Sequence, residues 1–166
     1  MPEKEVIERA QEDARQGKSP STQAGEFVHE EIEHVREGKH GARSPQQAIA
    51  IGLSKARRAG VKLPPPKSGS DKVRRQAERD TEKGKHPEEA PSGRRSRATT
   101  GALKREGTGS VSHRALSKQA SSSAGRRTAS QRSAAAQKAV RTKGTAGMKS
   151  AAQKAARTRA RKSSSR

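Results

Sequence analysis

Apolar and polar residues follow a helical spacing only in the first 66 residues of the chain. This part holds eleven of the sixteen Val, Ile, Leu and Phe residues. Val28, Ile32 and Val35 stand at positions i, i+4 and i+7, which places them on one face of a helix. Because the remaining hundred residues hold only five Val, Ile, Leu and Phe residues, we expect any packed structure to lie in residues 1–66.

Three helices are predicted in this part from their start and stop signals. The first spans about residues 2–15 and the second about residues 21–37, and a glycine follows each. The third has the clearest signals. Ser44 suits the N-cap, Pro45 suits the first helical position, and Gly60 suits the position after the end.

The composition predicts little further folding. Hydrophobic residues make up 27% and aromatic residues 1% of the chain, whose net charge is +21. Such chains typically bury too little apolar surface to offset the entropy lost on ordering. We therefore predict a mostly disordered protein with a small all-α N-terminal module of about three short helices at 1–66. A Ser/Gly/Arg-rich flexible linker at 67–132 and a basic tail at 133–166 would follow.

The tail contains an internal repeat. Ala-Ala-Gln-Lys-Ala-Val-Arg-Thr at 135–142 returns as Ala-Ala-Gln-Lys-Ala-Ala-Arg-Thr at 151–158. Ala, Lys, Arg and Gln favour helices, whereas crowded like charges oppose them. Glycines between the repeats predict a break. We expect the tail to be coil alone and partly helical when it is bound to phosphates. Short helical pieces are possible in the linker, at 97–106 and 112–120.

Charge is strongly asymmetric along the chain. Residues 1–37 carry a net −5, whereas residues 107–166 carry fifteen basic and no acidic side chains. Acid-free basic arms are typical of nucleic-acid binding. No basic stretch has the apolar face of a membrane-surface helix, so we expect no membrane partner. The predicted phosphate-contacting residues are those at the end of the linker, Arg126, Arg127 and Arg132, and those of the tail, Lys138, Arg141, Lys143, Lys149, Lys154, Arg157, Arg159, Arg161 and Lys162.

Three further cations end the third predicted helix. Lys55, Arg57 and Arg58 are candidate phosphate contacts of a small DNA-binding unit. Positive charge at a helix C-terminus also stabilises the helix by itself. A solvated helix face with favourable terminal charges therefore explains these three residues equally well.

The sequence contains no complete catalytic or metal-binding motif. The chain has no Cys, which excludes disulfides and Cys-based zinc sites. His29 and His34 lie five residues apart, whereas the helical zinc motif of metalloproteases needs a spacing of four. Gly17-Lys18-Ser19 lacks the first glycine of a phosphate-binding loop. We therefore predict no enzyme activity, no metal site and no cofactor.

Residues 37–66, from Glu-Gly-Lys-His-Gly-Ala-Arg-Ser-Pro through Ala-Gly-Val-Lys-Leu-Pro-Pro-Pro, resemble a bacterial family of small basic proteins of unassigned function. The Ala/Lys/Arg repeat at 133–162 resembles the tails of bacterial linker-histone-like proteins, which implies DNA compaction.

The resulting hypothesis is sequence-independent DNA binding by the tail, in the cytoplasm at the bacterial nucleoid. Duplex DNA is the favoured partner and RNA the alternative, as in a ribosome-associated protein. A second alternative is an adaptor in which residues 1–66 bind a protein partner or a second copy of the chain.

Overall fold

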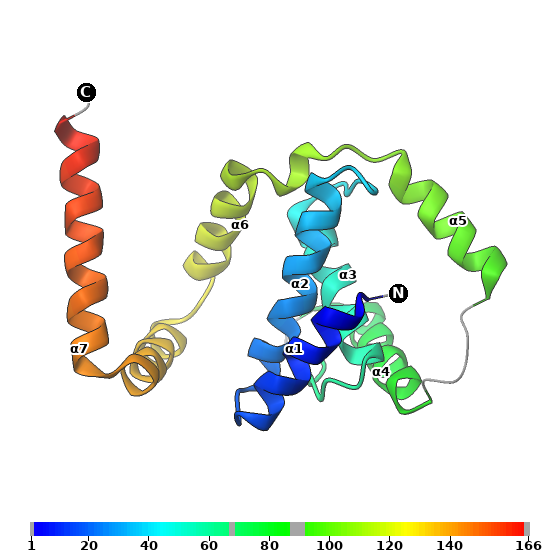
Figure 1. Ribbon diagram of the computed structural model, residues 1–166, viewed down its shortest axis with the longest axis horizontal. Helices are drawn as coiled ribbons and strands as arrows, with labels where there is room; N and C mark the ends of the chain where they lie inside the picture. Colours follow the sequence, from blue (N-terminus) through cyan, green and yellow to red (C-terminus); the bar gives the residue numbers. More distant parts are fainter. Residues whose placement is uncertain (1, 67–68, 87–91, 165–166) are drawn as a thin grey trace. The chain divides into compact units, whose positions relative to one another are not determined.

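The protein is helical over most of the residues that the computed structural model describes, 2–66, 69–86 and 92–164 (Figure 1). The chain divides into two compact units, Met1–Gln119 and Ala120–Arg166. In chain order the helices are α1 (Lys4–Arg15), α2 (Pro20–Arg36), α3 (Pro45–Arg58), α4 (Asp71–Lys85), α5 (Gly93–Lys104), the 3-10 helix η1 (Gly109–Val111), α6 (His113–Gly125) and α7 (Ala129–Ser164).

The first three helices confirm the sequence-based boundaries to within about two residues. Ser44 caps α3 by accepting a hydrogen bond from the Gln47 backbone N–H at 3.2 Å. Gly60 follows α3 with φ 90°, a conformation that glycine adopts at little cost. The next residue closes the helix end, because Val61 N–H donates to Ala56 O at 3.1 Å.

Two small apolar clusters hold the N-terminal unit together. The lone aromatic residue, Phe27, is fully buried at the centre of the larger one. The smaller one recruits Val111 of η1, which lies far along the chain and is also fully buried. The larger cluster comprises Val6, Ala10, Ala24, Phe27, Ala56 and Val61, and the smaller comprises Val35, Ala42, Ala48 and Val111.

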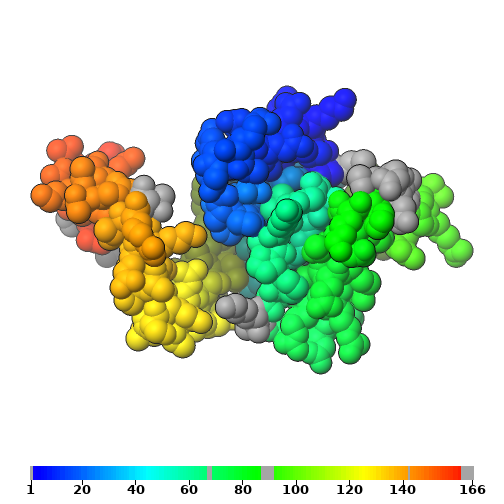
Figure 2. Space-filling view, turned by 90° about the horizontal axis from the view of Figure 1, so that it is seen from below, coloured from blue at the N-terminus to red at the C-terminus, as the bar shows by residue number. Residues whose placement is uncertain are grey.

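A close crossing of α2 and α3 sets the geometry of this unit. Gly52 lies in the middle of α3, where a Cβ atom would come within 2.7 Å of Val28 Cα and 2.9 Å of Phe27 O. Only a residue without a side chain permits this approach. α1 packs on α2, and α4 packs on α3 (Figure 2).

The structure continues beyond residue 66 through α4, which sequence analysis placed in a flexible linker. This helix has one large apolar residue, Val73, and it is 51% exposed. α4 is instead attached by Asp80, which is buried at 2% exposure. Its carboxylate accepts hydrogen bonds from Ser54 Oγ at 2.7 Å and Arg58 Nε at 2.8 Å. A search for apolar periodicity misses a helix that is anchored by polar contacts.

The prediction of a mostly disordered chain with about three short helices is wrong, because helices also cover 93–104, 113–125 and 129–164. Helical hydrogen bonds are local and need no apolar core. Eleven of the 36 residues in α7 are Ala, the strongest helix former. Each like-charge pair on a helix costs only about 0.2–0.5 kcal/mol, too little to offset this preference.

The predicted break between the two repeats is present. α7 is interrupted at Gly144, whose φ of 67° and ψ of 172° are not helical. The two repeats therefore lie on separate helical segments of α7 (Figure 1). None of the helices in the described ranges is both long and apolar enough to cross a membrane.

The α2–α3 crossing makes a stability prediction. Gly52→Ala should lower the free energy of unfolding by about 1–3 kcal/mol, because the added methyl group meets backbone atoms that cannot move aside. Gly25→Ala in α2 is the matched control, since its Cβ would meet nothing within 4 Å. It should stabilise the protein by up to about 1 kcal/mol through helix propensity. Urea unfolding followed at 222 nm measures both, and stabilisation by both would contradict the close crossing.

Candidate functional site

The second unit, Ala120–Arg166, carries basic side chains and no acidic ones. It contains thirteen of the 38 basic residues of the chain and none of its 17 acidic residues. Every predicted tail contact whose side chain is described is exposed, and the side chain of Lys162 lies outside the described ones. The exposed set is Arg126, Arg127, Arg132, Lys138, Arg141, Lys143, Lys149, Lys154, Arg157, Arg159 and Arg161.

The cations of α7 surround the helix instead of forming one stripe. Lys154 and Arg157 share a face, because residues three apart are neighbours on a helix. Arg159 follows two positions later, about 200° around the axis at 3.6 residues per turn. A surface of this kind is able to contact phosphates on both sides at once and has no preferred face for base recognition.

The three cations predicted at the end of α3 are engaged within the N-terminal unit. Arg57 is buried, and its guanidinium points at the carbonyl oxygens of Leu53, Leu63 and Pro64 at 3.3–3.5 Å. Burial lowers the pKa of Arg57 from its ordinary value. Arg58 holds the Asp80 carboxylate at 2.7 Å and is about half exposed.

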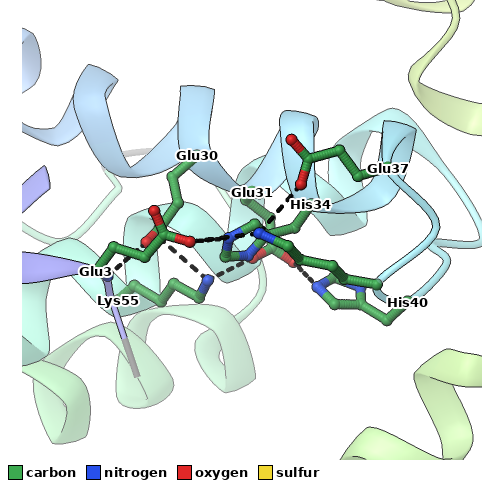
Figure 3. A network of polar contacts seen from close by, with 8 residues as sticks. Glu3, Glu30, Glu31, His34, Glu37, His40 and Lys55 are labelled. Atoms are coloured by element: carbon green, nitrogen blue, oxygen red, sulfur yellow. Dashed lines mark hydrogen bonds and ion pairs between the residues drawn. The ribbon is translucent and has the colours of Figure 1, made fainter.

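Lys55 lies in a buried ion-pair network between α2 and α3 (Figure 3). Its ammonium is 3.2 Å from Glu30 Oε2 and 2.8 Å from Glu31 Oε2. The Glu30 and Glu31 side chains are only 3% and 0% exposed, so the single lysine compensates two carboxylates that have lost most of their hydration. All three terminal cations of α3 thus have partners within the unit, whereas the described cations predicted in residues 126–161 are exposed.

The last turn of α2 and the loop that follows it each add one imidazole to this network, His34 and His40. His40 Nε2 lies 3.4 Å from Glu31 Oε1, and the His34 and His40 rings meet edge to face with their centroids 6.2 Å apart. His34 Nε2 is 3.0 Å from Glu3 Oε1. The hydrogen bonds from His34 and then Lys39 lower the pKa of the exposed Glu3 carboxyl.

Two groups of these side chains have the composition and spacing of metal ligands. Glu31, His34 and His40 form one, and Glu3, Glu30 and His34 form the other, with ligand atoms within 4.8 Å of one another in each. Sequence analysis rejected the pair His29 and His34 because of its spacing; in the structure His29 is exposed and belongs to neither group. His40 was missed because it lies beyond Gly38, where the chain leaves α2 and folds back.

Comparison with known proteins assigns no activity to the chain. Residues 16–68 are similar to a Family of unknown function (DUF6496). This agrees with the predicted resemblance to a family of unassigned function. No curated protein and no solved structure matches the chain. The matched segment contains α2, α3 and most of the polar network, whereas Glu3 and the cationic tail lie outside it.

The network predicts which lysine matters for stability. Lys55→Met should lower the free energy of unfolding by about 3–5 kcal/mol, because Glu30 and Glu31 would stay buried without their counter-charge. Lys62→Met, at an exposed position four residues after α3, should change it by no more than about 0.5 kcal/mol. Denaturant unfolding of both variants provides the comparison. A small, equal effect of the two changes would refute the network's role.

Proposed function

We propose that this protein binds duplex DNA without sequence specificity through the exposed cations of residues 120–166. The supporting observation is that this unit carries thirteen basic and no acidic side chains, and that its described cationic side chains are exposed, most of them on α7. In the N-terminal unit, by contrast, Lys55, Arg57 and Arg58 have partners inside the fold. The DNA compaction implied by the tail's resemblance to linker-histone-like proteins, at the bacterial nucleoid, is part of this proposal.

The affinity comes from phosphate neutralisation. A protein that pairs its cations with DNA phosphates releases condensed counterions, and this term is indifferent to sequence. The chain contains no Asn, and its one aromatic residue, Phe27, is buried in the core. Adenine readout by Asn and base stacking on exposed aromatic rings are therefore not available to the tail.

The helical form of α7 favours DNA over double-stranded RNA. An α-helix with its side chains is about 10–12 Å across, and the major groove of B-DNA is about 12 Å wide. The segment after Gly144 extends for about 30 Å at 1.5 Å per residue, which is close to one turn of the duplex. Cations on all sides of such a helix reach the phosphates of both groove walls. The deep, narrow major groove of A-form RNA does not admit it.

A pair of charge-matched variants tests the proposal. Replacing Lys149, Lys154, Arg157 and Arg159 by Gln should flatten the slope of log affinity against log salt by about 3–4, since each lost phosphate contact contributes about 0.9. Replacing Lys4, Lys62, Lys72 and Arg75, all exposed cations of the first unit, by Gln removes the same charge and should leave the slope nearly unchanged. Fluorescence anisotropy with a random duplex between 50 and 200 mM salt gives the slopes.

Two results would count against the proposal. Equal flattening by both variants would show that net charge alone drives binding, and a flat slope for the unmodified protein would exclude phosphate neutralisation. In the same assay, duplex RNA of equal length should bind more weakly than DNA. RNA binding as tight as DNA binding would favour the RNA-associated alternative.

A further inference from the structure

We propose that Glu31, His34 and His40 form a binding site for one divalent transition metal ion of the zinc class. The three side chains come from α2 and the loop that follows it, and they converge beside α3 (Figure 3). Two imidazoles and one carboxylate are the donor set that Zn²⁺ accepts in many three-ligand protein sites. A water molecule would take the fourth position.

The spacing of two ligand atoms already matches this coordination. His40 Nε2 and Glu31 Oε1 are 3.4 Å apart. Bonds of about 2.0–2.2 Å at a tetrahedral angle put neighbouring zinc ligands roughly 3.3–3.6 Å apart. A nitrogen of His34 lies within 4.8 Å of the other two ligand atoms, so binding of the ion would require a small movement of this side chain.

The hydrogen bonding of His40 leaves Nε2 ready to bind a cation. His40 Nδ1 lies 3.1 Å from Gly41 O, and a carbonyl only accepts, so Nδ1 carries the hydrogen. A backbone carbonyl on the second ring nitrogen is the usual arrangement for a metal-ligating histidine. In the neutral ring Nε2 then presents a lone pair to the Glu31 carboxylate, and a proton or a metal ion between these two acceptors would stabilise their approach.

Glu31 itself lacks the partners that a buried carboxylate needs. Its side chain is fully buried, and neither oxygen accepts a hydrogen bond from the described residues. Lys55 lies 2.8 Å from Oε2, without the angle of a hydrogen bond, and balances one charge on that side. Oε1 faces His40 and is the oxygen that would bind the metal. The lysine and the metal would therefore occupy different oxygens of the same carboxylate.

The surroundings suit a cation that arrives from solvent. Lys39, His40, Gly41 and Glu106 belong to the lining of a hollow of about 370 Å³ beside the site. Glu3 lies on the His34 ring, where its carboxylate orients the imidazole or contributes a further oxygen ligand. Two lysines, Lys39 and Lys104, also line this hollow. Glu37 holds the Lys39 ammonium at 3.0 Å, which reduces the repulsion that this lysine would exert on a metal ion.

The experiment uses the full chain, stripped with a chelator and titrated with Zn²⁺ against a chromophoric competitor. The expected result is one Zn²⁺ per chain, with affinity at least about 10–100-fold weaker in His40→Gln and in His34→Gln. His29→Gln, an exposed histidine on the same helix, is the matched control and should leave the affinity unchanged. Co²⁺ bound in place of Zn²⁺ should give the strong visible absorption of a tetrahedral site, which both ligand variants lose.

Far-ultraviolet circular dichroism establishes that each variant is folded. If His34→Gln does not fold, His40→Gln still tests the proposal, because it changes only the loop after α2. The proposal is overturned if the unmodified chain binds no stoichiometric Zn²⁺. It is equally overturned if His29→Gln weakens binding as much as His40→Gln does, since that result indicates adventitious surface histidines. DNA affinity should be the same in all three variants, so this test and that of DNA binding fail independently.

Discussion

The ion pair between Lys55 and two buried carboxylates joins α2 to α3, and the arrangement of the N-terminal unit depends on it. With few apolar side chains available, these two helices approach closely at Gly52 and bring Glu30 and Glu31 inside. Lys55 supplies the compensating charge from the facing helix. The same crossing fixes the end of α2, from which the loop carrying His40 folds back against Glu31.

This use of charge separates the chain into two parts with different roles. In the N-terminal unit, the basic residues at the end of α3 hold structural elements together. Arg58 pairs with Asp80 of α4, and Arg57 donates a hydrogen bond to the backbone carbonyl of Pro64. In residues 120–166 there is no acidic residue to pair with. Positive charge that cannot be neutralised within the unit favours a polyanionic partner. The proposed DNA binding and the proposed metal site thus occupy different units and rest on different interactions.

Sequence reasoning predicted the elements whose signals are local. Ser44, Pro45 and Gly60 marked α3, and Gly144 marked the break in α7. Sequence reasoning did not predict the elements whose position depends on a contact between residues distant in the chain. Asp80 anchors α4 without an apolar stripe, and Val111 completes a cluster from far along the chain.

The candidate sites divide in the same way. The exposure of the tail cations follows from composition, because residues 120–166 contain no acidic side chain and few large apolar ones. The engagement of Lys55, Arg57 and Arg58 could not be foreseen, since Glu30, Asp80 and Pro64 are distant or lie on another element. His40 joins Glu31 only because the chain reverses after Gly38. The tail helix was mispredicted because net charge was given more weight than the helix propensity of Ala, Lys and Arg.

The central claim is that the cations of the second unit, and not those of the first, contact DNA. Footprinting of lysine amines by acetylation, read by mass spectrometry on the full chain with and without duplex DNA, tests it most directly. We expect DNA to protect Lys138, Lys143, Lys149 and Lys154, whereas the exposed Lys62 and Lys72 should react equally with and without DNA. Protection of Lys62 and Lys72 with unchanged reactivity at 138–154 would contradict it.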